Sequence, residues 1–179
     1  TLLLAAALAL VPARAMAQHD HDHTHAAPEK LGRVNFPTSC KPDVQVAFTR
    51  SLALLHSFAY REAASAFAEV AANDPGCAMA QWGIAMSHFH PIWGPSTEGD
   101  FAAGRAAARK AVAVGAPSAR ERDYIAAIGA FYQGDGVSHP VRVAAYEQAM
   151  AGVAQRNSED HEAAIFHALA ILGVAYNSP

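Results

Sequence analysis

The chain has 179 residues, of which 52% are hydrophobic and 16% charged. This composition is typical of a folded domain and excludes a disordered chain. The formal net charge is −3 at pH 7, and because lysine and arginine form no basic stripe, we predict no nucleic-acid partner. Beyond the N-terminus no apolar run reaches the roughly 18 residues of a membrane span, so we expect no transmembrane segment in the mature chain.

The first residues, 1–17, have the pattern of a secretory signal peptide. An apolar run from Leu2 to Val11 precedes Ala-Met-Ala at 15–17, a small-x-small cleavage pattern. Because the initiator methionine and the basic start of such a peptide are missing, we interpret 1–17 as a remnant that is cleaved before Gln18. An ordinary apolar helix is the alternative. As a signal, the segment predicts an exported bacterial protein that is periplasmic or secreted.

Residues 18–38 form a predicted flexible linker that is rich in histidine. Its four alternating histidines are His19, His21, His23 and His25. Imidazole and carboxylate groups bind Zn²⁺ and Cu²⁺, so one hypothesis is metal capture, which a flexible tract achieves only weakly. A solvated tail is the alternative. At the end of the linker, Leu31, Val34 and Phe36 are expected to dock it on the first helical hairpin.

Seven helices are predicted within residues 39–179, over about 42–58, 60–73, 77–90, 100–114, 119–133, 140–156 and 159–176. In the second helix the apolar residues follow the spacing of one helix face, from Tyr60 through Ala63 and Phe67 to Val70. Pro75 ends this hairpin, because proline has no N–H and disfavours a helical residue before it. Such hairpins bury both faces only by stacking, which predicts an all-α helical-hairpin solenoid of about three and a half repeats.

Ala63, Phe67 and Pro75 stand at the spacing of the small, aromatic and proline positions of a tetratricopeptide repeat (TPR), whose period is about 34 residues. The stretches LALLHSF, DPGCAMAQWGIAM and HPIW resemble an uncharacterised family of exported bacterial TPR proteins. Val70 replaces the usual alanine, and the usual tryptophan and tyrosine of the first helix are missing. The resemblance implies a TPR-like domain over 39–179. Because family members are considerably longer, it also implies an N-terminal fragment, and it brings no established activity.

The last predicted helix, 159–176, has no partner in the predicted series of hairpins. Ala163, Phe166, Ala170 and Val174 fall on one of its faces. We expect no second helix to cover this face, so the predicted domain is truncated at its C-terminus.

Cys40 and Cys77 are the two cysteines of the chain. They lie at equivalent ends of adjacent predicted repeats, so in an oxidising compartment they are candidates for a disulfide. Closing a loop of this length would stabilise the fold by about 3–4 kcal/mol in the chain-entropy description. Two free or buried thiols are the alternative. Neither cysteine has an activating base beside it, so we predict no cysteine nucleophile.

His56 ends the first predicted helix, and His88 and His90 end the third. Repeat stacking is expected to place these ends at one edge of the array, where Trp82 and Trp93 are candidates for lining a pocket. The three histidines are also candidate ligands for Zn or Cu. Half-buried histidines held by hydrogen bonds are the simpler interpretation.

The catalytic and nucleotide-binding patterns GxSxG, HExxH, CxxC, GxGxxG and the Walker loop do not occur in the sequence. We therefore predict no catalytic residue and no firmly bound cofactor. The preferred interpretation is an exported helical-repeat scaffold that binds a protein or peptide on its concave surface. The alternative is a periplasmic metal-binding protein or metalloenzyme that uses the N-terminal histidines or the edge of His56, His88 and His90.

Metal titration separates these two interpretations. If only the histidine tract binds metal, the mature chain takes up Zn²⁺ or Cu²⁺ weakly, and deletion of residues 18–30 abolishes the uptake. Absorption spectroscopy and mass spectrometry measure how much metal binds to the mature chain and to the deletion variant. Tight, stoichiometric metal that survives the deletion would instead favour a metal site within the helical domain.

Overall fold

A computed structural model of the chain describes residues 30–177 and is all-α in this part, with seven α-helices and no strand. The helices are α1 (Gln45–His56), α2 (Tyr60–Asn73), α3 (Ala78–Ser87), α4 (Glu98–Val114), α5 (Ala119–Tyr132), α6 (His139–Arg156) and α7 (His161–Asn177), and the short 3₁₀ helix η1 (Pro42–Val44) precedes them. The all-α fold predicted from the sequence is therefore confirmed. None of these helices is both long enough and apolar enough to cross a membrane.

Several predictions about the N-terminus fall outside the described residues. They concern the signal remnant 1–17, the greater part of the linker 18–38 and the four histidines of that linker. These histidines are His19, His21, His23 and His25. The signal peptide and the metal-binding tract therefore stay predictions from the sequence.

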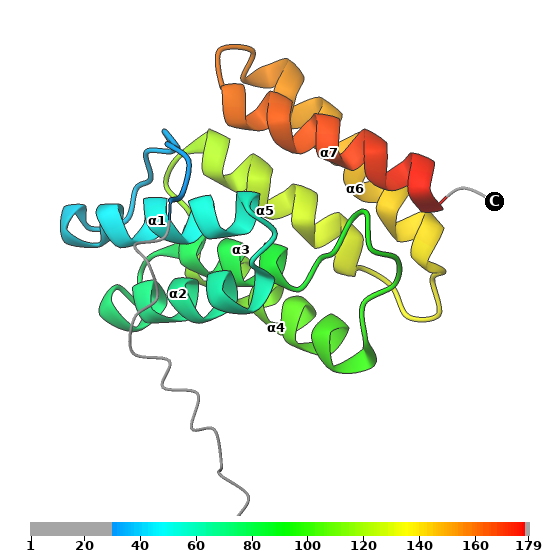
Figure 1. Cartoon of the computed structure of the whole chain (residues 1–179), viewed down its shortest axis with the longest axis horizontal. Coiled ribbons are helices and arrows are strands. Elements are labelled where there is room, and N and C mark those ends of the chain that lie inside the picture. Colours follow the sequence, from blue (N-terminus) through cyan, green and yellow to red (C-terminus); the bar gives the residue numbers. More distant parts are fainter. Residues whose placement is uncertain (1–29, 178–179) are drawn as a thin grey trace, which may run out of the picture. The chain divides into compact units, whose positions relative to one another are not determined.

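Each helix packs against the one that follows it, so that the chain forms a series of helical hairpins (Figure 1). In addition α1 contacts α3, and α3 contacts α5. The helices α1, α3 and α5 therefore share an inner layer, which Phe166 of α7 joins through ring contacts with α3 and α5, and each even-numbered helix packs against the two odd-numbered helices beside it. This arrangement is compatible with the predicted solenoid of helical hairpins. It buries Ala163, Phe166 and Ala170 of α7, which were expected to lack a cover.

Three aromatic residues at equal spacing join α3, α5 and α7. Trp82, Tyr124 and Phe166 lie 42 residues apart (124 − 82 = 42 and 166 − 124 = 42). Their ring centroids lie 5.6 Å, 5.5 Å and 6.2 Å apart in pairs. The inner layer thus repeats every 42 residues in this part, compared with about 34 in a TPR. The additional residues lie in the longer helices α4 and α6 and in the loops before them.

Two glycines allow aromatic rings to approach a neighbouring helix closely. A Cβ atom on Gly83 would lie 2.4 Å from ring atoms of Phe67, and one on Gly104 would lie 2.0 Å from the hydroxyl oxygen of Tyr132. Because the glycines leave this space free, Phe67 is completely buried between α2 and α3. Tyr132 donates a hydrogen bond of 2.9 Å to the carbonyl oxygen of Ala85 in the same way.

We predict opposite effects of one substitution at two helical glycines. Alanine favours a helix over glycine by about 1 kcal/mol, and Gly129→Ala in α5 adds a Cβ atom that meets nothing within 4 Å. This variant should be more stable than the wild type by up to about 1 kcal/mol. Gly83→Ala places its Cβ atom against the ring of Phe67 and should cost about 1–3 kcal/mol. Urea unfolding measures the free energy of unfolding of both variants. A Gly83→Ala variant as stable as the wild type would contradict the close approach of the Phe67 ring to α3.

Candidate functional site

The inner layer of helices holds a non-helical segment of the same chain, residues 31–41, which we call the strap. Phe36 of the strap is 1% exposed. Its ring centroid lies 5.8 Å from that of Phe48 in α1, 5.6 Å from that of Trp82 in α3 and 5.1 Å from that of Tyr124 in α5. The sequence predicted that Phe36 docks on the first hairpin, but the ring also reaches α3 and α5. One side chain of the strap therefore joins three helices.

Side chains of the helices bind the backbone of the strap. Gln45 in α1 donates from Nε2 to the carbonyl oxygen of Phe36 at 3.0 Å and accepts at Oε1 from the backbone N–H of Thr38 at 3.0 Å. The carboxylate of Glu121, which is buried in the first turn of α5, accepts a hydrogen bond from the backbone N–H of Ser39. Side-chain recognition of backbone groups depends little on the sequence of the bound segment. The inner layer is thus built to hold an irregular stretch of backbone.

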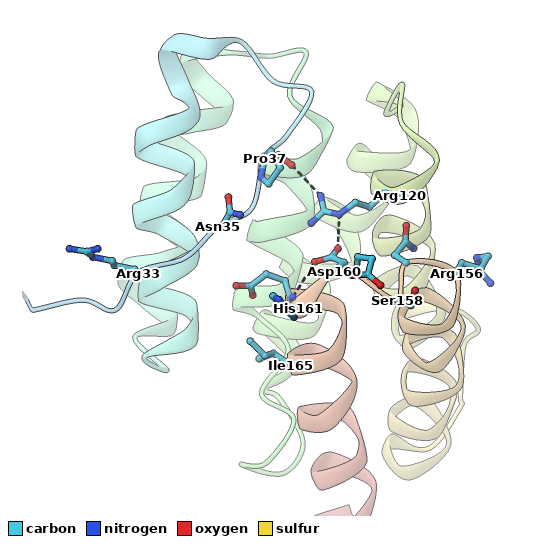
Figure 2. A pocket seen from close by; sticks show the side chains of 12 residues that line it. Arg33, Asn35, Pro37, Arg120, Arg156, Ser158, Asp160, His161 and Ile165 are labelled. Carbon is cyan, nitrogen blue, oxygen red and sulfur yellow. Dashed lines mark hydrogen bonds and ion pairs between the residues drawn. The ribbon is translucent and has the colours of Figure 1, made fainter.

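Arg120, at the start of α5, connects the strap to Asp160, the residue directly before α7 (Figure 2). Its guanidinium carbon lies 4.0 Å from the ring centroid of Phe36, and its Nη1 donates to the carbonyl oxygen of Pro37 at 3.1 Å. Its Nε donates to Asp160, which also accepts a hydrogen bond of 2.9 Å from the hydroxyl of Tyr124. Burial raises the pKa of Asp160, but the hydrogen bonds from Arg120 and Tyr124 outweigh it and hold this pKa below its ordinary value.

A cavity of about 710 Å³, which we call the inner groove, opens beside the strap. The strap, the start of α5, the α6–α7 turn and the first turns of α7 bound it (Figure 2). Its lining residues are Arg33, Asn35, Pro37, Arg120, Arg156, Asn157, Ser158, Glu159, Asp160, His161, Glu162 and Ile165. Among them, Arg33, Glu159 and His161 make no ion pair with any described residue, so they are free to contact a ligand. Lining charges of both signs suit a peptide better than a polyanion.

The structure joins Cys40, at the end of the strap, to Cys77 by a disulfide, with the Cα atoms 4.7 Å apart. Beside it the carboxylate of Asp74 accepts hydrogen bonds from the backbone N–H groups of Lys41 at 2.8 Å and Gly76 at 3.2 Å. Cys40, Asp74 and Cys77 are the one close group of potential metal ligands in the part of the chain that the structure describes. Because metals bind thiolates, the bonded sulfur atoms exclude this use while the disulfide is intact.

The three histidines predicted to share an edge lie in two different cavities. His56 lies 2.7 Å from Glu162 of α7, measured from Nε2 to Oε2, and lines a small apolar pocket. His88 lies 3.0 Å from Asp100 of α4, measured from Nδ1 to Oδ1, and lines a cavity of about 480 Å³ together with His90. Burial lowers the pKa of His90. His56 and His88 are thus each paired with a different carboxylate, and His56 does not line the cavity that His88 and His90 share.

The two predicted pocket tryptophans differ in their environment. Trp82 is 1% exposed and surrounded by the core rings, so it does not line an open pocket. Trp93 is 65% exposed in the α3–α4 loop, where it meets the ring of Phe58 edge-on at 6.2 Å. The apolar pocket beside His56 has a volume of about 160 Å³ and is lined by Leu55, His56, Phe58, Tyr60, Met86, Phe89, Pro91, Ile165, Phe166 and Leu169. Most of these residues are apolar and cannot be told from core residues in the sequence, and only the high apolar content of α7 after its first turn, interrupted by His167, indicates the pocket.

Fold and site together define an all-α protein of helical hairpins whose inner layer binds a non-helical segment beside an open groove. Comparison of the chain with protein-family models, with curated proteins and with solved structures finds no match. The similarity to TPR proteins therefore stays an interpretation of the residues quoted above.

We predict that the strap is required for stability. Phe36→Ala removes a buried ring and should lower the free energy of unfolding by about 3–5 kcal/mol. Phe58→Ala is the matched control: Phe58 is 42% exposed, so less apolar surface is lost and the cost should be clearly smaller than that of Phe36→Ala. Urea unfolding monitored by circular dichroism measures both values. Equal effects of the two substitutions would show that Phe36 does not anchor the strap.

Proposed function

We propose that the protein is a binding scaffold that holds a non-helical segment of a partner protein or a peptide in the inner groove. One observation carries this proposal: the inner layer already binds such a segment in the form of its own strap. The strap is held by one buried aromatic ring and by hydrogen bonds with its backbone groups: Gln45 and Arg120 donate to its carbonyl oxygens, and Gln45 and Glu121 accept from its N–H groups.

The groove offers a second segment the same kinds of contact. It runs along the strap and the start of α7, and its volume of about 710 Å³ has room for several residues. Arg33, Glu159 and His161 supply charged and polar groups at its rim, and Ile165 supplies an apolar surface at its end. A peptide that lies there would bury side chains against α7 and direct its backbone to polar groups.

We also propose that the protein acts outside the cytoplasm. The apolar run and the small-x-small pattern at 15–17 support export. The pairing of Cys40 with Cys77 suits an oxidising compartment, because disulfides persist there and are rare in the cytosol. The partner would then be an exported or extracellular protein.

Selection from a random linear peptide library tests the binding proposal. Peptides enriched on the immobilised protein are synthesised with a fluorescent label, and their affinities are measured by fluorescence polarisation. Ser158 is exposed at the rim of the groove, so Ser158→Arg fills the entrance with a long charged side chain. We expect this variant to bind the selected peptides at least about tenfold more weakly than the wild type.

Ala113→Arg is the matched control, because Ala113 is exposed on α4 and does not line the groove. It introduces the same side chain elsewhere and should leave peptide affinity unchanged. If no peptide is enriched, or if Ser158→Arg binds the selected peptides as well as Ala113→Arg does, the groove is not a peptide site.

A further inference from the structure

The end of the strap and the turn between α2 and α3 bring three potential metal ligands together. Cys40 of the strap and Asp74 and Cys77 of the turn offer ligand atoms that all lie within 4.8 Å of one another. Zinc binds thiolate sulfur at about 2.3 Å and carboxylate oxygen at about 2.0–2.2 Å in a tetrahedral arrangement, which places the ligand atoms about 3.5–4 Å apart. The three ligand atoms can therefore surround one zinc ion once the sulfur atoms are no longer bonded to each other.

The turn presents two of these ligands at a spacing that zinc sites use. Two residues separate Asp74 from Cys77, as two residues separate the cysteines of a C-x₂-C zinc motif. The backbone N–H of Cys77 donates a hydrogen bond of 3.0 Å to the carbonyl oxygen of Asp74, which closes the turn and keeps its two ends together. Cys40 lies 37 residues before Cys77 in the sequence. A metal bound to all three residues would thus join the strap to the start of α3.

The carboxylate of Asp74 is oriented by its own hydrogen bonds. Asp74 is 5% exposed. Its Oδ2 accepts from the backbone N–H of Lys41 at 2.8 Å, and its Oδ1 accepts from that of Gly76 at 3.2 Å. Because a carboxylate has about four lone-pair sites, each oxygen can still bind a metal. Carboxylates that bind metals are typically held by such hydrogen bonds, which fix their direction.

Reduction of the disulfide would create a charge that a divalent cation balances. Two thiolates beside Asp74 place three negative charges within 4.8 Å of one another, and like charges disfavour each other. Lys41 is the ion-pair partner that the structure gives Asp74, but its Nζ lies 4.0 Å from Oδ1 and its side chain is 60% exposed. A metal ion between the sulfur atoms and the carboxylate balances these charges directly, and it deprotonates the thiols that it binds.

The environments of the two sulfur atoms indicate how a dithiol would reduce the bond. Cys40 is half-buried, whereas Cys77 is 1% exposed. The Sγ atom of Cys77 accepts a hydrogen bond of 3.3 Å from the backbone N–H of Ala80, in the first turn of α3. The N-terminus of a helix stabilises a thiolate at this position. Cys40 is therefore the more accessible sulfur, and Cys77 is the better leaving group.

The exchange balances in two steps. A thiolate of the dithiol attacks Sγ of Cys40, the bond between Cys40 and Cys77 breaks, and Cys77 leaves as a thiolate. The second sulfur of the dithiol then attacks the first and displaces Cys40. The dithiol has become a disulfide, and its two electrons have reduced the cysteine pair. When both thiolates bind a metal, the two protons of the dithiol pass to water.

We propose that Cys40, Asp74 and Cys77 bind Zn²⁺ when a dithiol has reduced the disulfide, and that the metal then replaces the disulfide as the link between the strap and α3. Beside the two cysteines lies a cavity of about 10 Å³, about the size that one water molecule needs, so a water can complete the tetrahedron. Thiolate ligands favour Zn²⁺ over Ca²⁺ and Mg²⁺, which bind oxygen, and the carboxylate favours it over Cu⁺. None of the three ligands lines the inner groove, so this proposal does not depend on peptide binding there.

Co²⁺ is the probe, because it occupies tetrahedral zinc sites and its bond to a thiolate gives a charge-transfer absorption in the near ultraviolet. The N-terminal histidines give no such absorption, so the whole mature chain is used. It is reduced with a phosphine, which is not itself a thiol ligand, and is titrated without oxygen. We expect saturation at one Co²⁺ per chain, displacement by Zn²⁺, and no thiolate absorption from the oxidised protein.

Asp74→Asn tests the carboxylate, because it keeps the shape of the side chain and removes its charge. This variant should bind Co²⁺ at least about tenfold more weakly. Asp43→Asn is the matched control, since Asp43 is exposed near Cys40 and outside the ligand group, and it should bind Co²⁺ as the wild type does. Circular dichroism checks the fold. If Asp74→Asn does not fold, Asp74→Cys replaces it and should strengthen the absorption, because it supplies a third thiolate.

Urea unfolding tests whether the metal links the strap to α3. Zn²⁺ should raise the urea midpoint of the reduced protein, because it binds the folded site, and should leave that of the oxidised protein unchanged. Weak binding by the N-terminal histidines would act on both forms alike, so the difference between the forms reports the cysteine site.

Four results would overturn the proposal. One is a reduced wild type without thiolate absorption, and another is equal Co²⁺ affinity of Asp74→Asn and Asp43→Asn, or unchanged absorption of Asp74→Cys where that variant is used. A third is saturation at one Co²⁺ per two chains, which would place the metal between molecules. The fourth is a urea midpoint of the reduced protein that Zn²⁺ does not change.

Discussion

Four buried aromatic rings, those of Phe36, Trp82, Tyr124 and Phe166, hold the described part of the chain together, because each comes from a different element. Phe36 belongs to the strap, and the other three belong to α3, α5 and α7. Large aromatic side chains contribute most to core stability per residue. Since 130 residues separate the first ring from the last (166 − 36 = 130), their contacts link the two ends of the helical series. The position of Arg120 above Phe36, and with it the wall of the inner groove, depends on this cluster.

The helices were predictable from the sequence because local periodicity determines them. Ala63 and Phe67 follow the spacing of one helix face, and both are completely buried in the structure. Contacts between distant residues were not predictable in this way. Glu121 lies in the first turn of a helix, where acidic residues are common at the surface. Nothing in its neighbours shows that its carboxylate is buried and binds Ser39, 82 residues away.

The three histidines that were predicted to share an edge show the same limit of prediction from the sequence. The positions of His56 and His88 at helix ends suggested a shared site, yet each histidine has its own acidic partner. Glu162 comes from a helix 106 residues further along the chain, and Asp100 comes from the helix that follows α3. The hydrogen bond to such a partner decides the direction of an imidazole ring. Helix periodicity contains no information about that partner, so it could place the backbone of these residues but not their side chains.

The disulfide between Cys40 and Cys77 has a consequence for competition at the inner layer. It fixes the end of the strap to the start of α3, so a strap that detaches stays within a few residues of its own binding site. Rebinding is then intramolecular, with an effective concentration in the millimolar range. A free peptide that displaces Phe36 must exceed this local concentration, whereas one that lies beside the strap meets no such competitor. The covalent link therefore favours ligands that use the strap as one wall of their site over ligands that replace it.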